Sequence, residues 1–192
     1  MLFGQNIGLR SGVEYSDNSF VNNSLGFGGY LNIEGIYKHM ELLFSYDYFE
    51  NEIDVNDNFN ITKYGFVSTN YKHSLSSSIL FAIPLKERIK IKTGANFKYC
   101  VLNATNIYYP KNILSTFKSS YVGLGGVINF QFTEIFNIRP LNFDIFITPE
   151  YLINLKEESN PLYATTEYSS NLKLLNLQMG LSYKLDTKRK DN

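Results

Sequence analysis

Two long runs of alternating side chains, residues 25–37 and 40–49, constrain the fold of this chain more than any other feature of its sequence. Apolar residues and glycine occupy the odd positions of the first run, and apolar residues occupy the even positions of the second. The change of face falls at Lys38 and His39. A period of two is that of a β-strand, so the two runs and their short turn predict an antiparallel hairpin. Each run is roughly twice the usual strand length of soluble proteins and close to the length of a tilted membrane-crossing strand.

The same period recurs along the rest of the chain. Further strands are predicted at 6–16, 71–83, 89–101, 120–132, 142–155 and 175–185, which gives eight strands in all. The connections after the second, fourth and sixth strands are short or fairly short. Most of the others are longer and polar, and the main outer loops are predicted at 51–62, 103–119 and 156–170. A meander whose two ends differ in this way is typical of membrane barrels, because one end was threaded through the membrane.

Length and composition narrow the class of protein. A chain of 192 residues is expected to form one domain. We interpret residues 1–5 as the remnant of a signal peptide, 6–185 as a β-barrel and 186–192 as a charged tail. Lys and Arg total 18, as do Asp and Glu, so no excess positive charge favours nucleic acid as a partner. The longest apolar run, at 79–85, is too short for a membrane-spanning helix.

Alternation alone does not say which face lies inside, because a membrane barrel and a soluble barrel with an apolar core both alternate. The volume of the side chains decides between them. An eight-stranded barrel has only just enough interior room for side chains, and the apolar face carries most of the Phe, Tyr, Leu and Ile of these strands. The polar face is rich in glycine. We therefore predict an all-β protein, an eight-stranded antiparallel up-and-down transmembrane β-barrel whose apolar face points into lipid.

This assignment places charged residues of both signs inside the barrel. The predicted lumen charge network comprises Arg10, Glu14, Glu34, Glu41, Asp47, Lys90, Lys92, Lys98, Asp144, Glu150 and Lys184. Its six acids and five bases nearly cancel, and buried charges are tolerated only when they are paired. The sequence therefore predicts a closed lumen rather than a conducting pore. Tyrosines near the strand ends are expected to form the interfacial girdles, namely Tyr15, Tyr37, Tyr48, Tyr99, Tyr151 and Tyr183.

Three segments resemble a known family. The opening strand from Asn6 to Tyr15, the glycine-rich second strand and the closing segment from Gly180 to Leu185 are similar to strands of small bacterial outer-membrane barrels of the PorT-like type. The architecture also resembles the OmpA and OmpX barrels. The resemblance implies the bacterial outer membrane as location, contact with its lipid or lipopolysaccharide, insertion by the barrel-assembly machinery, and both termini in the periplasm. The chain departs from that pattern because a charged tail follows Leu185, where such chains usually finish on an aromatic residue.

The sequence predicts no enzyme, cofactor or metal site. His, Cys, Asp and Glu show no metal-ligand spacing. His73 and Ser74 suggest the His/Ser pairs of lipid-modifying barrel enzymes, but adjacent strand residues point to opposite faces and do not form a nucleophile–base pair directly. We expect a non-enzymatic barrel that presents its outer loops or serves as an accessory subunit of a secretion or assembly complex with other envelope proteins. Two alternatives remain open, namely a soluble lipocalin-like ligand-binding barrel and a lipid-modifying outer-membrane enzyme.

Overall fold

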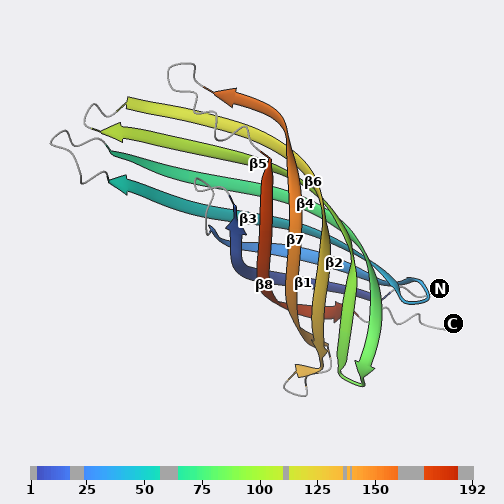
Figure 1. Ribbon diagram of the computed structural model, residues 1–192. Coiled ribbons are helices and arrows are strands. Elements are labelled where there is room, and N and C mark those ends of the chain that lie inside the picture. Colours follow the sequence, from blue (N-terminus) through green and yellow to red (C-terminus); the bar gives the residue numbers. More distant parts are fainter. Residues whose placement is uncertain are drawn as a thin grey trace.

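The computed structural model shows eight antiparallel strands that form one closed barrel in chain order (Figure 1). The strands are β1 (Gly4–Ser16), β2 (Ser24–Tyr37), β3 (Met40–Asn56), β4 (Gly65–Lys86), β5 (Ile89–Tyr109), β6 (Ile113–Thr133), β7 (Leu141–Ser159) and β8 (Leu172–Leu185). The structure describes residues 4–17, 24–56, 65–109, 113–135, 138, 140–159 and 171–185. Among them, no helix is long and apolar enough to cross a membrane. The predicted eight-stranded up-and-down barrel is confirmed.

The two ends of the barrel are defined by its strand pairing. β1 closes the ring against β8, and Gln5 pairs with both Ile33 and Leu185. The beginning of β1 and the end of β8 therefore lie at the same end as the turn at Lys38 and His39. We call this the termini end and the opposite end the distal end.

The turn between β2 and β3 explains why the alternation changes face. Because the turn contains two residues, Tyr37 pairs with Met40, and odd positions of β2 lie opposite even positions of β3. Paired residues share one face of the sheet, so the outward face moves from odd to even positions. The register of β2 shifts between Ile33 and Tyr37. Gly35 lies within this irregularity at a φ of 74°, a conformation that glycine adopts without steric cost.

The strands extend further than the sequence predicts. Residues 103–109 pair with 65–71 on one side, and residues 103–108 pair with 113–118 on the other, so the prediction of a long loop at 103–119 is wrong. β3 and β7 likewise continue to Asn56 and Ser159, into the segments predicted as loops. Lipid contact requires an apolar face only within the membrane. Beyond it the backbone pairing continues without the alternation on which the prediction depends.

Several predicted boundaries are affected by these extensions. β1 begins at Gly4, two residues before the predicted barrel boundary. Residues 1–3 and the predicted tail at 186–192 lie outside the described part of the chain, as do 57–62 and 160–170 of the predicted outer loops. Figure 1 shows the long strands β3 to β6 continuing together at the distal end past the shorter β1 and β2.

The outward face of the strands is apolar around the barrel. Leu9 is 76% exposed, Leu124 69% and Phe27 63%. Similar exposed apolar side chains lie on every strand from β1 to β8, and we call this outward band the apolar belt. The tyrosines predicted for the girdles are also outward-facing and at least partly exposed. The prediction that the apolar face points away from the barrel axis is confirmed.

The inner face is polar through most of the barrel and apolar near the distal end. A buried distal cluster is formed by side chains from β5 to β8, namely Cys100, Leu102, Ala104, Phe117, Tyr121, Leu152, Leu172 and Leu174. A second buried cluster of Tyr30, Leu43, Leu80, Val127 and Phe146 lies among the polar residues. The inner face is therefore more apolar toward the distal end than the alternating pattern alone predicts.

Candidate functional site

The predicted charged residues all lie on the inner face of their strands. Eight of the eleven are buried, and Glu34, Lys90 and Lys184 are partly exposed at the termini end. Lys72 of β4 lies among them and is 2% exposed. With Lys72 included, the lumen charge network has six acids and six bases. From here on the name refers to these twelve residues.

The centre of the network is the ion pair between Arg10 of β1 and Asp47 of β3. The guanidinium donates from Nε to Asp47 Oδ1 at 2.8 Å and from Nη2 to Oδ2 at 2.5 Å, and Nη2 also donates to Ser45 Oγ at 2.6 Å. Gln178 Nε2 of β8, the strand paired with β1, donates to Asp47 Oδ1 at 3.0 Å. The bidentate geometry is the strongest form of an arginine–carboxylate pair. Together with the Gln178 hydrogen bond, this ion pair joins β1, β3 and β8 across the interior.

Glu150 of β7 accepts hydrogen bonds from a second set of donors. Its carboxylate accepts from Lys98 Nζ at 2.5 Å, from Asn96 Nδ2 at 2.5 Å and from Asn176 Nδ2 at 2.7 Å. The Glu150 and Lys98 side chains are 1% and 4% exposed. The charge of Glu150 is thus compensated by one cation and two amides, as a buried carboxylate requires.

Asp144 of β7 is satisfied by neutral donors. Tyr30 Oη donates to it at 2.7 Å and Ser182 Oγ at 2.8 Å, and the side-chain amides of Gln131 and Asn129 donate at 3.1 and 3.2 Å. Among the described residues, no Lys or Arg nitrogen lies within 4.0 Å of this carboxylate. Four hydrogen bonds therefore replace an ion pair at this position.

Glycine makes room for the ring of Tyr30. A Cβ atom at Gly8 of β1 would lie 2.4 Å from Tyr30 Cζ, and one at Gly180 of β8 would lie 3.1 Å from its Cε1. The ring therefore lies directly over these two strands, and it meets the Phe146 ring at 76° with centroids 5.2 Å apart. The glycine-rich inner face is what allows a large side chain to cross the lumen and reach Asp144.

The termini end of the lumen carries a looser group of charges. Lys92 Nζ lies 2.7 Å from Glu41 Oε2 and 3.8 Å from Glu34 Oε1. Lys90 and Lys184 lie 3.7 and 3.8 Å from Glu34. Their side chains are 29% and 44% exposed, so water screens these contacts more than those of the buried pairs.

Lys72 was missing from the residues predicted for the network. Its Nζ bonds to Glu14 Oε1, both side chains are buried, and the ammonium lies 4.8 Å from the centre of the Phe49 ring. The alternation of the fourth strand could have identified Lys72 as a lumen residue, because Lys72 occupies an even position, as do the inward-facing Ser74 and Ser78. This pair borders the distal apolar cluster, since Lys72 pairs across strands with Leu102.

A small cavity lies between these groups. A cavity of about 10 Å³ lies beside Arg10, Glu150 and Asn176, which is about the room of one water molecule. Among the described residues, five buried side-chain oxygens accept no hydrogen bond from the protein, namely Asn6 Oδ1, Glu14 Oε2, Asn32 Oδ1, Gln131 Oε1 and Asn176 Oδ1. Around this cavity, side chains from opposite strands lie close together, and the described lumen holds several acceptors without a donor.

The two residues considered for enzymatic use do not come together. His73 is exposed on the outward face, where its Nδ1 lies 2.7 Å from Tyr46 Oη. Ser74 is buried on the inward face and donates to the backbone oxygen of Asp47 at 3.4 Å. Across the described ranges, no three His, Cys, Asp or Glu side chains are grouped so that they could hold a metal ion.

Solved structures with a similar fold are outer-membrane proteins. A major outer membrane protein of Thermus thermophilus is 12% identical, with 96% of this chain and 100% of that chain covered and a TM-score of 0.66. Ail, the attachment invasion locus protein of Yersinia pestis in complex with the heparin analogue sucrose octasulfate, is 12% identical over the same shares, with a TM-score of 0.58. Neisserial surface protein A is 13% identical, with 95% and 97% covered and a TM-score of 0.53.

Sequence comparison adds no closer assignment. No family model and no curated protein matches the chain. The PorT-like type stays a prediction, whereas the small-barrel fold rests on closed strand pairing, an apolar outer face and the structural likeness. The chain has the fold of the small bacterial outer-membrane β-barrels.

Proposed function

We propose that this protein is a non-enzymatic barrel of the bacterial outer membrane whose lumen is closed and whose distal strands form the working surface. In this proposal the barrel-assembly machinery inserts the chain, outer-membrane lipid or lipopolysaccharide surrounds the apolar belt, and the termini end faces the periplasm. The distal surface serves adhesion, or it joins other envelope proteins when the barrel is an accessory subunit of a secretion or assembly complex.

The observation that carries the proposal is the packing of the lumen. Arg10 with Asp47, Lys98 with Glu150 and Lys72 with Glu14 form buried pairs across it, and the distal apolar cluster lies beyond them. A solute would have to break buried ion pairs to pass, which costs several kcal/mol for each pair. Transport through the barrel is therefore unfavourable, and the outer surface is left as the place of function.

The distal strands present exposed side chains that could serve this role. Residues 103–108 of β5 remain paired with residues 113–118 of β6 at the distal end, and the exposed side chains of Leu114 and Lys118 lie on this part of β6. Ail is named as an attachment protein, so a barrel of this fold is compatible with a role in attachment.

Two measurements test the proposal. In planar bilayers the protein should give no stable conductance, and steady large steps would contradict the closed lumen. On intact cells, a membrane-impermeant maleimide should label Leu114→Cys but not Glu87→Cys, an exposed residue in the β4–β5 turn at the termini end. Cys100 is buried, so the background is low. Labelling of Glu87→Cys alone would mean the opposite orientation.

Partner contact has its own test. Purification in mild detergent should recover envelope proteins with the wild-type barrel if it is an accessory subunit. A variant with Leu114 and Lys118 both replaced by Glu would lose these partners if the distal strands bind them. A barrel that co-purifies with no envelope protein would instead favour adhesion.

The alternatives have less support in the structure. A lipocalin-like barrel needs an apolar ligand cavity, whereas the described apolar belt faces outward and the centre of the lumen is charged. A lipid-modifying enzyme would need a nucleophile beside His73, and Ser74 lies on the opposite face. Loss of lipid hydrolysis in His73→Ala, if the wild-type protein hydrolyses lipid at all, would restore the enzyme hypothesis.

A further inference from the structure

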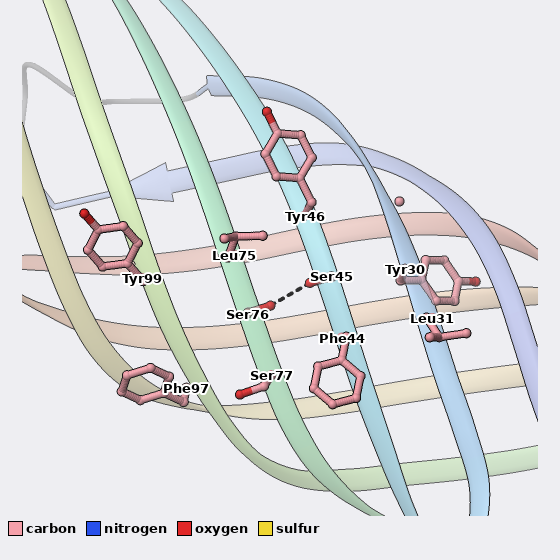
Figure 2. A pocket seen from close by; sticks show the side chains of 11 residues that line it. Tyr30, Leu31, Phe44, Ser45, Tyr46, Leu75, Ser76, Ser77, Phe97 and Tyr99 are labelled. Carbon is pink, nitrogen blue, oxygen red and sulfur yellow. Dashed lines mark hydrogen bonds between the residues drawn. The ribbon is translucent and has the colours of Figure 1, made fainter.

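An open hollow of about 600 Å³ lies in the apolar belt over β2 to β5, and its central part follows β4 between β3 and β5. Figure 2 shows Leu75 and Ser77 of β4 along its floor, with Phe44 and Tyr46 on one side and Phe97 and Tyr99 on the other. The strand register produces this shape, because Ser77 pairs with Phe44 and with Phe97, so the smallest side chain lies between two large ones. The walls stand on strands roughly 10 Å apart. The hollow is therefore a groove that suits one hydrocarbon chain.

The aromatic side chains of the groove carry hydroxyl groups at one end only. Phe44 and Phe97 line it toward the termini end, whereas Tyr46 and Tyr99 carry their hydroxyls toward the distal end (Figure 2). Further along β4 lies His73, whose Nδ1 is 2.7 Å from Tyr46 Oη. An apolar trough with hydrogen-bonding groups at the distal end has the polarity of a lipid, with its acyl chain toward the middle of the membrane and its headgroup toward the surface.

The groups around the polar end indicate the charge of that headgroup. Tyr48 contacts His73 with ring centroids 5.2 Å apart, stacks on Tyr71 at 6.4 Å and donates to Glu50 Oε2 at 3.2 Å. Glu52 is also exposed, two residues further along β3. Among the described side chains, the outward faces of β2 to β5 carry no Lys or Arg at this level. Aromatic rings beside carboxylates attract ammonium groups and disfavour purely anionic ones.

We propose that this groove binds one acyl chain of a membrane lipid whose headgroup ends in a primary ammonium, held by the rings of Tyr48 and Tyr71 and the carboxylate of Glu50. The proposal rests on the membrane placement of the apolar belt given under the proposed function. It adds a lipid class and a site that the closed-lumen proposal does not require.

Native mass spectrometry of the detergent-solubilised protein tests the proposal with two lipids of equal chain length. Dipalmitoyl phosphatidylethanolamine carries the ammonium, and dipalmitoyl phosphatidylglycerol replaces it with a neutral glycerol. The wild-type protein should bind the first about five- to tenfold more tightly, the combined effect of an exposed cation–π contact and an exposed ion pair. Equal binding of both lipids would overturn the headgroup assignment.

Two variants separate the parts of the site. Ser77→Phe fills the groove and should reduce binding of both lipids, whereas Glu50→Gln should remove most of the preference and keep the chain bound. Ser11→Phe is the matched control, because Ser11 lines a second outward hollow of about 560 Å³ on β1, β2, β7 and β8, which does not include Ser77 or the strand that carries Glu50. An equal loss in Ser11→Phe, or none in Ser77→Phe, would mean non-specific lipid contact.

The lipid-binding experiments and the tests of the proposed function can fail independently. Conductance and cysteine labelling do not depend on Glu50 or Ser77, so a closed, correctly oriented barrel without lipid selectivity would contradict only this inference. A selective barrel that conducts would contradict only the closed lumen.

Discussion

Removal of the guanidinium at the centre of the lumen is the most direct test of how the interior is held together. Arg10→Met keeps a long apolar side chain near Phe146, whose ring lies 5.0 Å from the guanidinium. It deletes both hydrogen bonds to Asp47 and the one to Ser45. Asp47, with a side chain only 2% exposed, then keeps Gln178 at 3.0 Å and Ser45 at 3.5 Å. One buried charge would be left without a counterion.

The expected cost follows from that environment. Removing one partner of a buried ion pair typically destabilises by about 3–5 kcal/mol, which is a large share of a total stability of roughly 5–15 kcal/mol. Asp47→Asn should cost a comparable amount, because it leaves Arg10 without its counterion. The double variant Arg10→Met with Asp47→Asn removes both charges and should recover most of the loss, since neutral replacement of a buried pair is often tolerated.

Urea unfolding of the refolded barrel in detergent micelles, followed by circular dichroism of the β-sheet band, measures these free energies. Lys156→Met is the control, because the Lys156–Glu158 pair is exposed and should contribute nothing measurable. A loss of less than about 1 kcal/mol in Arg10→Met would refute the reasoning. So would a double variant whose loss equals the sum of the two single ones, since residues in contact should couple.

Three further predictions address other parts of the molecule. Gly8→Ala should destabilise by about 1–3 kcal/mol, because its Cβ meets the Tyr30 ring; Tyr30→Leu in the same chain should relieve this in urea unfolding, and an unchanged midpoint for Gly8→Ala would argue against the packed ring. Asp144→Asn should cost about 1–3 kcal/mol, because its amide faces donors; the same titration measures it, and a stability equal to wild type would mean that the carboxylate charge is not required there. Hydrogen exchange should be slow at the amides of 103–108, which pair with both β4 and β6; exchange at the rate of an unstructured peptide would support the loop prediction instead.

The alternation of single strands predicted the face of each charged residue but not its partner. Parity placed Arg10 and Asp47 inside because each side of a strand repeats every two residues. That Tyr30 reaches Asp144, 114 residues away in the chain, depends on the register of the closed barrel and on the room left by Gly8. Neither is visible in one strand. The sequence could predict a neutral interior, whereas the pairing within it required the fold.

The missed strand extensions have a different cause. Thr105 and Ser115 are polar residues, so they add nothing to an apolar alternation. They belong to β5 and β6 because their backbones pair with neighbouring strands. Hydrophobic period therefore detects the part of a strand that contacts lipid or a core. It does not detect a strand that continues into water. The groove over Ser77 was also not predicted, because its walls are formed by cross-strand neighbours that one strand's pattern does not reveal.

The continued pairing of β4 to β6 sets where a partner would meet this protein. From Tyr99 at the girdle to Tyr109 at the end of β5, a tilted strand rises by roughly 25 Å. Backbone hydrogen bonds to β4 and β6 make this part of β5 a rigid extension of the sheet rather than a flexible loop. A binding partner or antibody would therefore encounter a surface at a fixed height and angle above the bilayer, and its reach rather than loop flexibility would decide whether contact occurs.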